Sequence, residues 1–392
     1  MRKSILAGLC WLVATLVAPF SAHAQGTVKV GLIMTYTGQF TDAAAQMDNG
    51  IKLYMKQHGD TVAGKKIEII RKDDAGAPDA AKRLAQDLIV NDNVDILAGF
   101  VITPEALTVA DLSAQAKKFM VDMNAATSII TEKSPYIVRT SLTIAQNCET
   151  LGTWAAKNGV KKVFIMVSDY APGHDAEAAF QRTFTAAGGQ IAEAVHVPMA
   201  NPDFSAFVQR AKDSGADGIF VFIPGGSQPA ALAKALVERG MDPNKLKIMG
   251  QGELTDESAL KAMGDAAIGI ITAFHYDYTH DSPTNKKFVA DYNAAFGRNP
   301  DLFSVGGYDG MHVIYEALKA TGGKTDGDSL IAAAKGMKWE SPRGPVAIDP
   351  ATRDIINTVY IRKVEKVNGH VQNVEIAKVE NVKDPVKERM AK

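Results

Sequence analysis

The sequence predicts an α/β protein with two Rossmann-like lobes, each built around a parallel sheet. Short apolar segments alternate with amphipathic helical segments almost without interruption, and the alternation starts again near residue 145. This pattern indicates strands joined by helical crossovers, which place helices on both faces of a sheet. A chain of 392 residues is also long enough for two such domains.

The first half of the chain supplies four strands and three helices. Each predicted strand is a short apolar run, and each predicted helix carries apolar residues three and four positions apart. The strands are expected at 28–34, 66–72, 94–100 and 118–123, and the helices at 43–58, 78–91 and 104–116.

The second half repeats this order without a convincing residue-level repeat. Helices are expected at 145–157, 174–187, from 203 onward and at 228–238, and strands at 161–167, 190–197, 217–223, 246–250 and 268–276.

The remainder of the chain has a different character. No Pro/Ser-rich linker separates the two halves, so we expect the chain to cross between the lobes more than once; one large single sheet is the alternative. Three consecutive helices are expected at 283–297, 305–320 and 328–335, followed by strands at 346–350 and 357–364 and by a frayed, lysine-rich tail.

The N-terminus has the composition of a secretory signal peptide. Two basic residues precede an apolar run over residues 5–17, and the sequence Ala-His-Ala at 22–24 offers small residues where a signal peptidase cleaves. The run is too short for a membrane span, although a membrane anchor is the alternative. We expect residues 1–24 to be removed, which gives a periplasmic protein that starts near Gln25.

The composition limits the partners of the protein. Its 43 Lys and Arg residues balance 44 Asp and Glu residues, and the charges are interspersed. This argues against nucleic acid and against an anionic membrane surface. Cys10 lies in the predicted signal, so Cys148 alone cannot form an internal disulfide. No cofactor is expected, because the glycine-containing segment 222–230 lacks the lysine and spacing of a phosphate-binding loop.

The sequence SDYAPGHD at 168–175 combines residues that could suggest catalysis or a metal site. Ser168 ends a predicted strand but lacks the glycine flanks of a nucleophile elbow, and a triad draws its partners from distant segments. An exported hydrolase that uses Ser168 and His174 is therefore the disfavoured alternative. His174 and Asp175 are adjacent and point to different helix faces, so no metal site is expected. Tyr170, at the carboxyl edge of the sheet, is a candidate wall or lid for an apolar ligand.

Two other strand-to-helix junctions carry hydroxyl groups. Thr103 is the expected N-cap in GFVITPEAL, and MNAATSIIT offers Ala125 and Thr127 on open backbone. Helix starts carry free N–H groups and positive partial charge, so the two junctions together could hold a carboxylate. An ordinary capped helix is the alternative for each. Glu253, beside two glycines at another strand end, is a candidate acid that faces a polar group of the ligand.

The chain from about residue 27 to 366 resembles a known family through a series of motifs in the same order. VKVGLIMTYTGQF is similar to the opening strand and first ligand loop of the periplasmic substrate-binding proteins of ABC importers, in the branch that binds leucine, isoleucine and valine. RKDDAGAPDAA, AGFVITPEAL, MNAATSIIT, SDYAPGHDAE and GYDGMHVIYEAL are similar to later motifs of that branch.

The resemblance implies the type I periplasmic binding fold, in which three crossover segments join two α/β lobes that clamp a small ligand without catalysis. The implied partners are a small-molecule carboxylate and an ABC permease in the inner membrane, and the implied state is a monomer. A ligand sensor with the same fold is the alternative. The implied division is 25–140 and 277–340 for lobe 1, 141–276 and 341–378 for lobe 2, and 379–392 for the tail.

The resemblance also implies roles for particular residues. Thr103, Ala125 and Thr127 would receive a carboxylate, Tyr170 would approach the ligand from lobe 2, and Tyr276 would lie on the cleft wall at a crossing.

Two departures from the family pattern concern the ligand. Gly76 and Ile102 stand where amino-acid-binding members often carry cysteines, and the acid that pairs with an ammonium does not align cleanly with Glu253. An ammonium without an acidic partner would be poorly held. We therefore favour an aromatic or apolar carboxylic acid slightly over a branched-chain amino acid, with an amide as a further possibility. The expected ligand-binding residues are Phe40, Phe100, Thr103, Ala125, Thr127, Tyr170, Glu253 and Tyr276, without catalytic or metal-binding residues.

Overall fold

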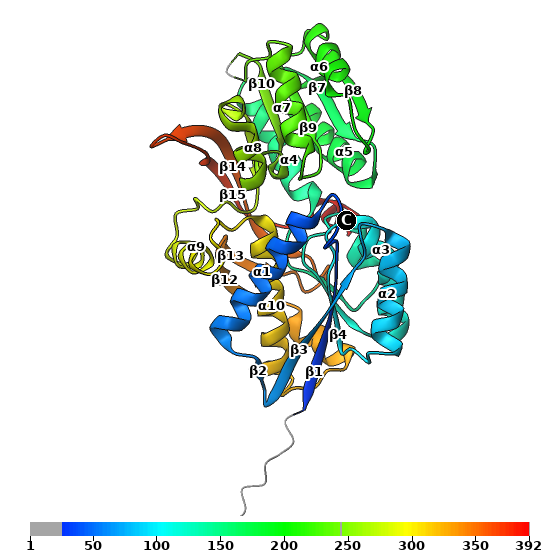
Figure 1. Ribbon diagram of the computed structural model, residues 1–392. Helices are drawn as coiled ribbons and strands as arrows, with labels where there is room; N and C mark the ends of the chain where they lie inside the picture. The colour runs from blue at the N-terminus through cyan, green and yellow to red at the C-terminus, as the bar shows by residue number, and fades with distance from the viewer. Residues whose placement is uncertain (1–25, 244, 392) are drawn as a thin grey trace, which may run out of the picture.

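The structure is a computed structural model that describes residues 26–243 and 245–391. Figure 1 shows two lobes, one above the other, and each contains segments from distant parts of the chain. The predicted signal peptide, 1–24, lies outside the described residues. Over the part of the chain that the structure describes, no helix is long and apolar enough to cross a bilayer.

Lobe 1, the lower lobe in Figure 1, is built on a six-stranded sheet with the order β2-β3-β1-β4-β5-β6. Neighbouring strands are parallel except for β2 and β3, which pair antiparallel at one edge. The strands are β1 (Thr27–Met34), β2 (Thr61–Val62), β3 (Lys65–Asp73), β4 (Ile96–Gly99), β5 (Phe119–Asp122) and β6 (Ile137–Arg139).

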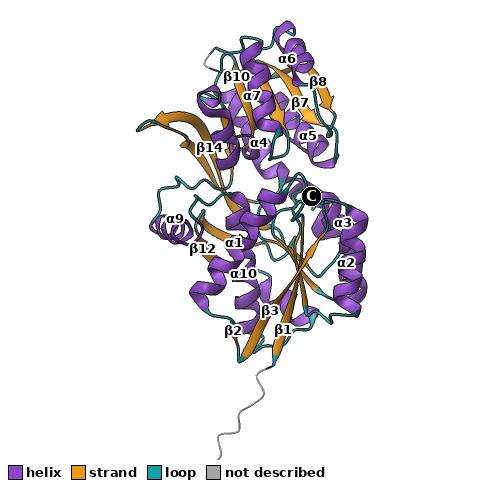
Figure 2. Ribbon diagram, in the orientation of Figure 1, coloured by secondary structure: helices purple, strands orange, loops and turns teal. Residues whose placement is uncertain are grey.

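Helices cover both faces of this sheet, with α1 and α10 on one side and α2 and α3 on the other (Figures 1 and 2). Helices α1 and α10 approach closely because Gly307 of α10 has no side chain where the carbonyl group of Met47 in α1 lies. The helices are α1 (Thr41–His58), α2 (Pro78–Val90), α3 (Thr103–Ala116), the 3₁₀ helix η1 (Ser128–Glu132), α9 (Pro283–Phe296), α10 (Leu302–Ala320) and α11 (Gly327–Ala334).

Lobe 2 has a second sheet, in which β8, β7, β9, β10 and β11 follow one another in parallel. Its strands are β7 (Lys162–Ser168), β8 (Gln190–Val197), β9 (Gly218–Phe222), β10 (Lys247–Gln251) and β11 (Ile271–Phe274). Its helices are α4 (Ile144–Lys157), α5 (Ala171–Ala186), α6 (Phe204–Asp213), α7 (Gln228–Glu238), η2 (Gly252–Thr255), α8 (Glu257–Met263) and η3 (Gly264–Ala267). The predicted fold class, two α/β lobes with mainly parallel sheets, is confirmed.

The chain passes between the lobes three times. The first passage joins β6 to α4, and the second joins β11 to α9. The third runs along β14 (Ile355–Val367), whose start pairs with β13 (Gly344–Ile348) and whose later part pairs with β11.

The strands before the third passage lie against lobe 1. In β12 (Lys338–Ser341), Trp339 Nε1 and Ser341 Oγ donate hydrogen bonds to the carboxylate of Asp309 in α10, at 2.9 and 2.8 Å. The third passage therefore comes later in the chain than the expected boundary at residue 341.

The expected frayed tail is wrong. The chain continues as β15 (His370–Val382), which pairs with β14, and ends in α12 (Pro385–Met390), placed between the lobes in Figure 1. Lys387 anchors this helix, because its buried ammonium lies 2.6 Å from Asp354 Oδ2. We expected a frayed end because the segment is rich in lysine. Composition alone does not reveal that one of these lysines, Lys387, is buried in an ion pair.

Candidate ligand-binding site

A narrow cavity lies where the two lobes meet, beyond the carboxyl ends of the parallel strands. Open α/β sheets bind their ligands at this edge. The walls are mainly apolar and come from both lobes. They are formed by Phe40, Val101, Ile102, Thr103, Asn124, Ala125, Ala126 and Phe303 of lobe 1, Ile144 of the first passage, and Tyr170, Pro172, Phe222, Pro224 and Glu253 of lobe 2.

The junction between β4 and α3 presents a hydroxyl group to this cavity. Helix α3 begins at Thr103, and Ile102 takes the N-cap position that we expected for Thr103. The carboxylate of Glu105 accepts the backbone N–H of Ile102 at 3.2 Å, so a side chain within the helix supplies the cap. The Thr103 hydroxyl is therefore not used for capping and lies 3.1 Å from Thr127 Oγ1.

The junction after β5 is fastened to the first one. Asn124 Nδ2 donates a hydrogen bond to the carbonyl of Val101 at 2.7 Å, and the backbone N–H of Ala125 donates to the carbonyl of Phe100 at 3.2 Å. Asn124 Oδ1 is buried without a hydrogen-bond partner among the described residues. One wall of the cavity thus combines two rigid strand ends with a free amide oxygen and two hydroxyl groups.

The opposite wall is aromatic and carries one acid. Tyr170 stands at the N-cap of α5, and its ring centroid lies 6.2 Å from that of Phe222, which ends β9. Burial and the neighbouring charge of Glu253 raise the pKa of Tyr170 well above its usual value, so its hydroxyl remains protonated. This wall offers ring surface together with a hydrogen-bonding group.

Glu253 is held by the loop that follows β9. Its Oε2 atom accepts the backbone N–H of Gly225 at 3.1 Å. Burial raises the pKa of Glu253 to about 7, and the pKa of nearby Asp256 rises to about 7 for the same main reason. A carboxyl group with such a pKa can either donate or accept a hydrogen bond near neutral pH.

Comparison with known proteins identifies the family. The family model of the periplasmic binding proteins matches residues 27–369. The chain belongs to this family. The resemblance found in the sequence is therefore confirmed at the level of the family and its type I fold.

Individual relatives of this periplasmic binding protein are similar over almost their whole length. The curated Leu/Ile/Val-binding protein homolog 6 of Brucella melitensis is 46% identical over 369 residues, which cover 93% of this chain and 95% of the relative. A solute-binding protein of an ABC transporter from Rhodopseudomonas palustris BisB5, solved with 3,4-dihydroxybenzoic acid, is 58% identical with a TM-score of 0.90, covering 92% of this chain and 99% of that one. Its counterpart from Rhodopseudomonas palustris HaA2, solved with p-hydroxybenzoic acid, is 45% identical with a TM-score of 0.90, covering 93% and 100%.

The cavity brings together five of the eight residues expected to bind ligand. These are Phe40, Thr103, Ala125, Tyr170 and Glu253. Thr127 lies at its margin, where its hydroxyl contacts Thr103 and its side chain lines the adjoining space between the lobes.

Phe100 and Tyr276 do not line the cavity. Phe100 has a φ of +69°, and its ring packs in the core of lobe 1 beside α2 and α3. Tyr276 packs with Phe288 and Tyr292 in a separate cluster, and its hydroxyl donates to Asn285 Oδ1 at 3.0 Å. Both residues lie near strand ends, but their side chains turn into the protein.

Several lining residues were not among the expected site residues. Phe222 ends β9 and Pro224 follows it, so the rule that ligands bind at the carboxyl ends of the strands, which selected Tyr170, could have found them. Phe303 gave no such signal, because it lies in the first turn of α10, which follows a helix.

The disfavoured hydrolase alternative finds no support in the geometry of SDYAPGHD. Ser168 Oγ is buried and has no hydrogen-bond partner within the described part of the chain. His174 Nε2 instead lies 3.0 Å from Asp169 Oδ1. The serine therefore has no base beside it.

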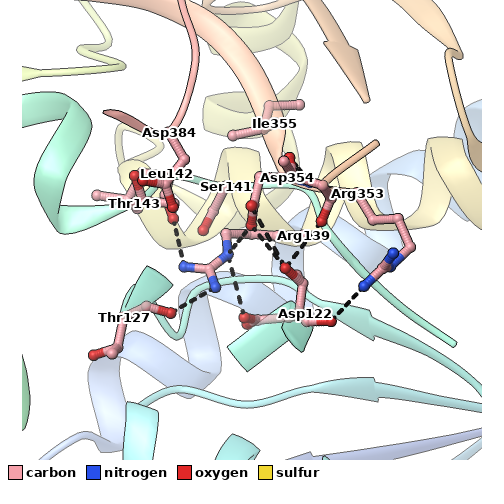
Figure 3. A network of polar contacts seen from close by, with 12 residues as sticks. Asp122, Thr127, Arg139, Ser141, Leu142, Thr143, Arg353, Asp354, Ile355 and Asp384 are labelled. Atoms are coloured by element: carbon pink, nitrogen blue, oxygen red, sulfur yellow. Dashed lines mark hydrogen bonds and ion pairs between the residues drawn. The ribbon is translucent and has the colours of Figure 1, made fainter. Parts of the chain in front are cut away.

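A buried ion network links the cavity to the passages between the lobes (Figure 3). Arg139, at the end of β6, donates to the carbonyl groups of Thr127 at 2.7 Å and Leu142 at 3.2 Å, and its Nε lies 3.2 Å from Asp354 Oδ1. Asp354 immediately precedes β14 and also pairs with Lys387. One fully buried guanidinium thus joins the Thr127 loop to the first and third passages.

The two lobes also touch on the side of the cavity near α1 and α8. Asp42 Oδ2 of lobe 1 accepts the hydroxyl of Ser258 of lobe 2 at 2.8 Å. Arg298 of lobe 1 donates to Asp42 at 2.6 and 3.1 Å and to Ser258 Oγ at 3.1 Å. These contacts hold the lobes together in this structure.

Proposed function

We propose that this periplasmic binding protein captures a hydroxylated aromatic carboxylate between its lobes and delivers it to an ABC permease, without catalysing a reaction. The observation that carries the proposal is the distribution of polar groups in the cavity. Hydroxyl groups and a helix start lie on the lobe 1 wall, one acid lies on the lobe 2 wall, and rings and aliphatic side chains lie between them. A flat ring with a carboxylate at one end and a hydroxyl at the other matches this distribution.

The carboxylate end of the ligand is assigned to the two threonines. Among the described residues that line the cavity there is no Lys or Arg. An anion must then be held by hydroxyl groups, backbone N–H groups and the positive end of α3. Thr103 and Thr127, whose hydroxyl oxygens lie 3.1 Å apart, form a pair of donors that one carboxylate can span.

The hydroxyl end is assigned to Glu253. An ammonium group requires an ionised acid, and the burial that raises the pKa of Glu253 to about 7 opposes ionisation. A phenolic hydroxyl requires only a hydrogen bond, which either form of Glu253 can make. The two similar proteins solved with dihydroxybenzoic and hydroxybenzoic acids support this class of ligand.

A branched-chain amino acid is the second candidate. It is favoured by the Brucella relative, which is named as a Leu/Ile/Val-binding protein homolog. In that case Glu253 would pair with the ammonium group, while the threonines would keep the carboxylate.

The proposal also covers the location, the oligomeric state and the partners of the protein. We infer that residues 1–24 direct export to the periplasm and that the protein works as a monomer without nucleic acid as a partner. A sensor that reports the same ligand to a different partner would use the same closure.

Isothermal titration of the protein with four compounds tests the ligand class. We expect 3,4-dihydroxybenzoate and 4-hydroxybenzoate to bind, benzoate to bind about tenfold more weakly for want of one hydrogen bond, and leucine not to bind. Binding of leucine in preference to all three benzoates would reject the aromatic ligand.

Glu253→Gln separates the two candidates further. Glutamine keeps an oxygen for the N–H of Gly225, so hydroxybenzoate binding should change by no more than about tenfold. An ammonium ligand should lose much more, because its charge would be left unpaired. The exposed Glu238→Gln variant in α7 is the matched control.

A further inference from the structure

A cluster of metal-ligating side chains lies on lobe 2, where β7 and β8 end beside the start of α5. One ligand atom each from Asp169, His174 and His196 lies within 4.8 Å of the others. His174 Nε2 is 3.0 Å from Asp169 Oδ1, and the two imidazole rings are 4.5 Å apart between centroids. Glu177 adds a fourth group, with its Oε2 2.7 Å from His196 Nε2.

The backbone fixes the places from which these side chains extend. His196 lies in β8 opposite Val167 of β7, and the backbone N–H of Asp169 donates to the carbonyl of Val197 at 2.8 Å. His174 and Glu177 are three residues apart in α5, so they lie on one face of the helix. A strand, a loop and a helix therefore present their ligands to one point on a framework of backbone hydrogen bonds.

We propose that Asp169, His174 and His196 bind one divalent transition-metal ion of the zinc type, with Glu177 as a fourth ligand or as a hydrogen-bonding partner of His196. Two imidazoles and a carboxylate suit Zn²⁺, Co²⁺, Ni²⁺ or Cu²⁺ rather than Ca²⁺ or Mg²⁺, which prefer oxygen ligands. The positive end of α5 would repel the ion. The carboxylates of Asp169 and Glu177 offset this repulsion and balance the charge of the ion.

The required movement is small. Ligands about 2.1 Å from a tetrahedral Zn²⁺ lie about 3.4 Å apart, so ligand atoms that now lie within 4.8 Å of one another need shift only slightly. Exposed side chains can do so by changing rotamer: His174, His196 and Asp169 are 46, 42 and 61% exposed. Such exposure also predicts a moderate affinity.

This cluster is separate from the cavity between the lobes. It borders an outer hollow lined also by Gln181 and Arg182. Nε of Arg182 lies 4.0 Å from Glu149 Oε1, an interaction with the neighbouring helix α4. We expected no metal site from the sequence because His174 and Asp175 point apart. In the structure, the second histidine of the cluster is His196, which extends from strand β8.

The test uses the chain from residue 25 onward, purified without a polyhistidine tag and stripped with EDTA. Isothermal titration with ZnCl₂ is compared with CaCl₂ and MgCl₂, and the absorption spectrum of the Co²⁺ form reports histidine ligation. No aromatic acid is added, so the result does not depend on the proposed ligand. The variants are His174→Ala and His196→Ala, with His370→Ala, an exposed histidine of β15, as the matched control.

We expect one Zn²⁺ per chain and no binding of Ca²⁺ or Mg²⁺. Each histidine variant should weaken zinc binding by more than about tenfold, because even changes to outer-shell groups cost this much, while the control should bind as the unaltered chain does. Absence of zinc binding by the unaltered chain, or zinc binding by both histidine variants as tight as that of the unaltered chain, would overturn the proposal. Thermal unfolding monitors the fold, and His174→Gln and His196→Gln replace any alanine variant that does not fold.

Discussion

The hydroxyl oxygens of Thr103 and Thr127 lie 3.1 Å apart, although the two residues belong to different strand-to-helix junctions. Thr103 opens α3, and Thr127 precedes the 3₁₀ helix η1. Two hydroxyl groups at this separation can donate to the two oxygens of one carboxylate. The junctions are also held together by the hydrogen bond between Asn124 and Val101, so the backbone that carries the two threonines is in place before a ligand arrives.

Replacement of either threonine by valine should weaken ligand binding. We expect the dissociation constant of 3,4-dihydroxybenzoate to rise about 10- to 100-fold in Thr103→Val and in Thr127→Val, since a hydrogen bond to a charged group contributes about 1.5–3 kcal/mol. Isothermal titration measures the change. Thr108→Val is the control, because the Thr108 hydroxyl donates to the carbonyl groups of Pro78 and Glu105 in lobe 1. Unchanged affinity in both variants would exclude this carboxylate anchor.

The contact between Asp42 and Ser258 should slow the release of ligand. Ser258→Ala removes the lobe 2 partner of both Asp42 and Arg298. Partly exposed contacts of this kind contribute up to about 1 kcal/mol, so dissociation should become up to about fivefold faster, with little change in association. Stopped-flow fluorescence measures both rates. Lys286→Ala, which breaks an exposed ion pair with Asp281, is the control. Equal rates of ligand release in the two variants would count against a role for the contact between Asp42 and Ser258.

Loss of the buried Arg139 should destabilise the whole protein. Arg139→Met leaves the fully buried Asp122 without its nearest cation and removes one of the two cations beside Asp354. Breaking a buried ion pair in this way costs about 3–5 kcal/mol of unfolding free energy, measured by urea denaturation. Arg210→Met, which breaks an exposed pair with Glu193, should cost no more than about 1 kcal/mol. Similar losses in the two variants would contradict a structural role for the network in Figure 3.

The buried pair Glu105 and Asp74 should make stability fall as the pH rises. Both carboxylates bond to the Thr35 hydroxyl, and burial together with the charge of Asp74 raises the pKa of Glu105 from 4.5 to about 8. Between these values the folded protein keeps a proton that the unfolded chain releases. The free energy of unfolding therefore falls by about 1.4 kcal/mol per pH unit for each such proton.

Glu105→Gln tests this pH dependence because glutamine resembles the protonated acid. Urea denaturation at several pH values between 5 and 8 should give a smaller slope in Glu105→Gln than in the unaltered chain. Glu253, Asp256 and Asp301, whose pKa values are also raised to about 7, keep part of the slope. The exposed Glu238→Gln variant should retain all of it, and identical slopes in the two variants would show that Glu105 is not the titrating group.

Ligands in open α/β sheets bind at the carboxyl ends of the strands, and this rule explains why part of the candidate site could be predicted. Thr103, Ala125, Tyr170 and Glu253 each follow a predicted strand, and parallel strands bring their carboxyl ends to one edge. The rule fixes where the backbone ends but not where the next side chain points. Phe100 obeys it in position, yet its positive φ turns the ring into the core.

The sequence by itself determined the fold class, the two-lobed order and the edge at which the site lies, because these follow from local periodicity and from motifs in a fixed order. Only the tertiary structure decided that Phe303 faces the cavity, that Lys387 anchors the last helix and that His196 meets His174. Each of these contacts joins residues from separate elements. Such contacts depend on how the elements pack in three dimensions, and a periodic pattern along one segment carries no information about the segment that lies beside it.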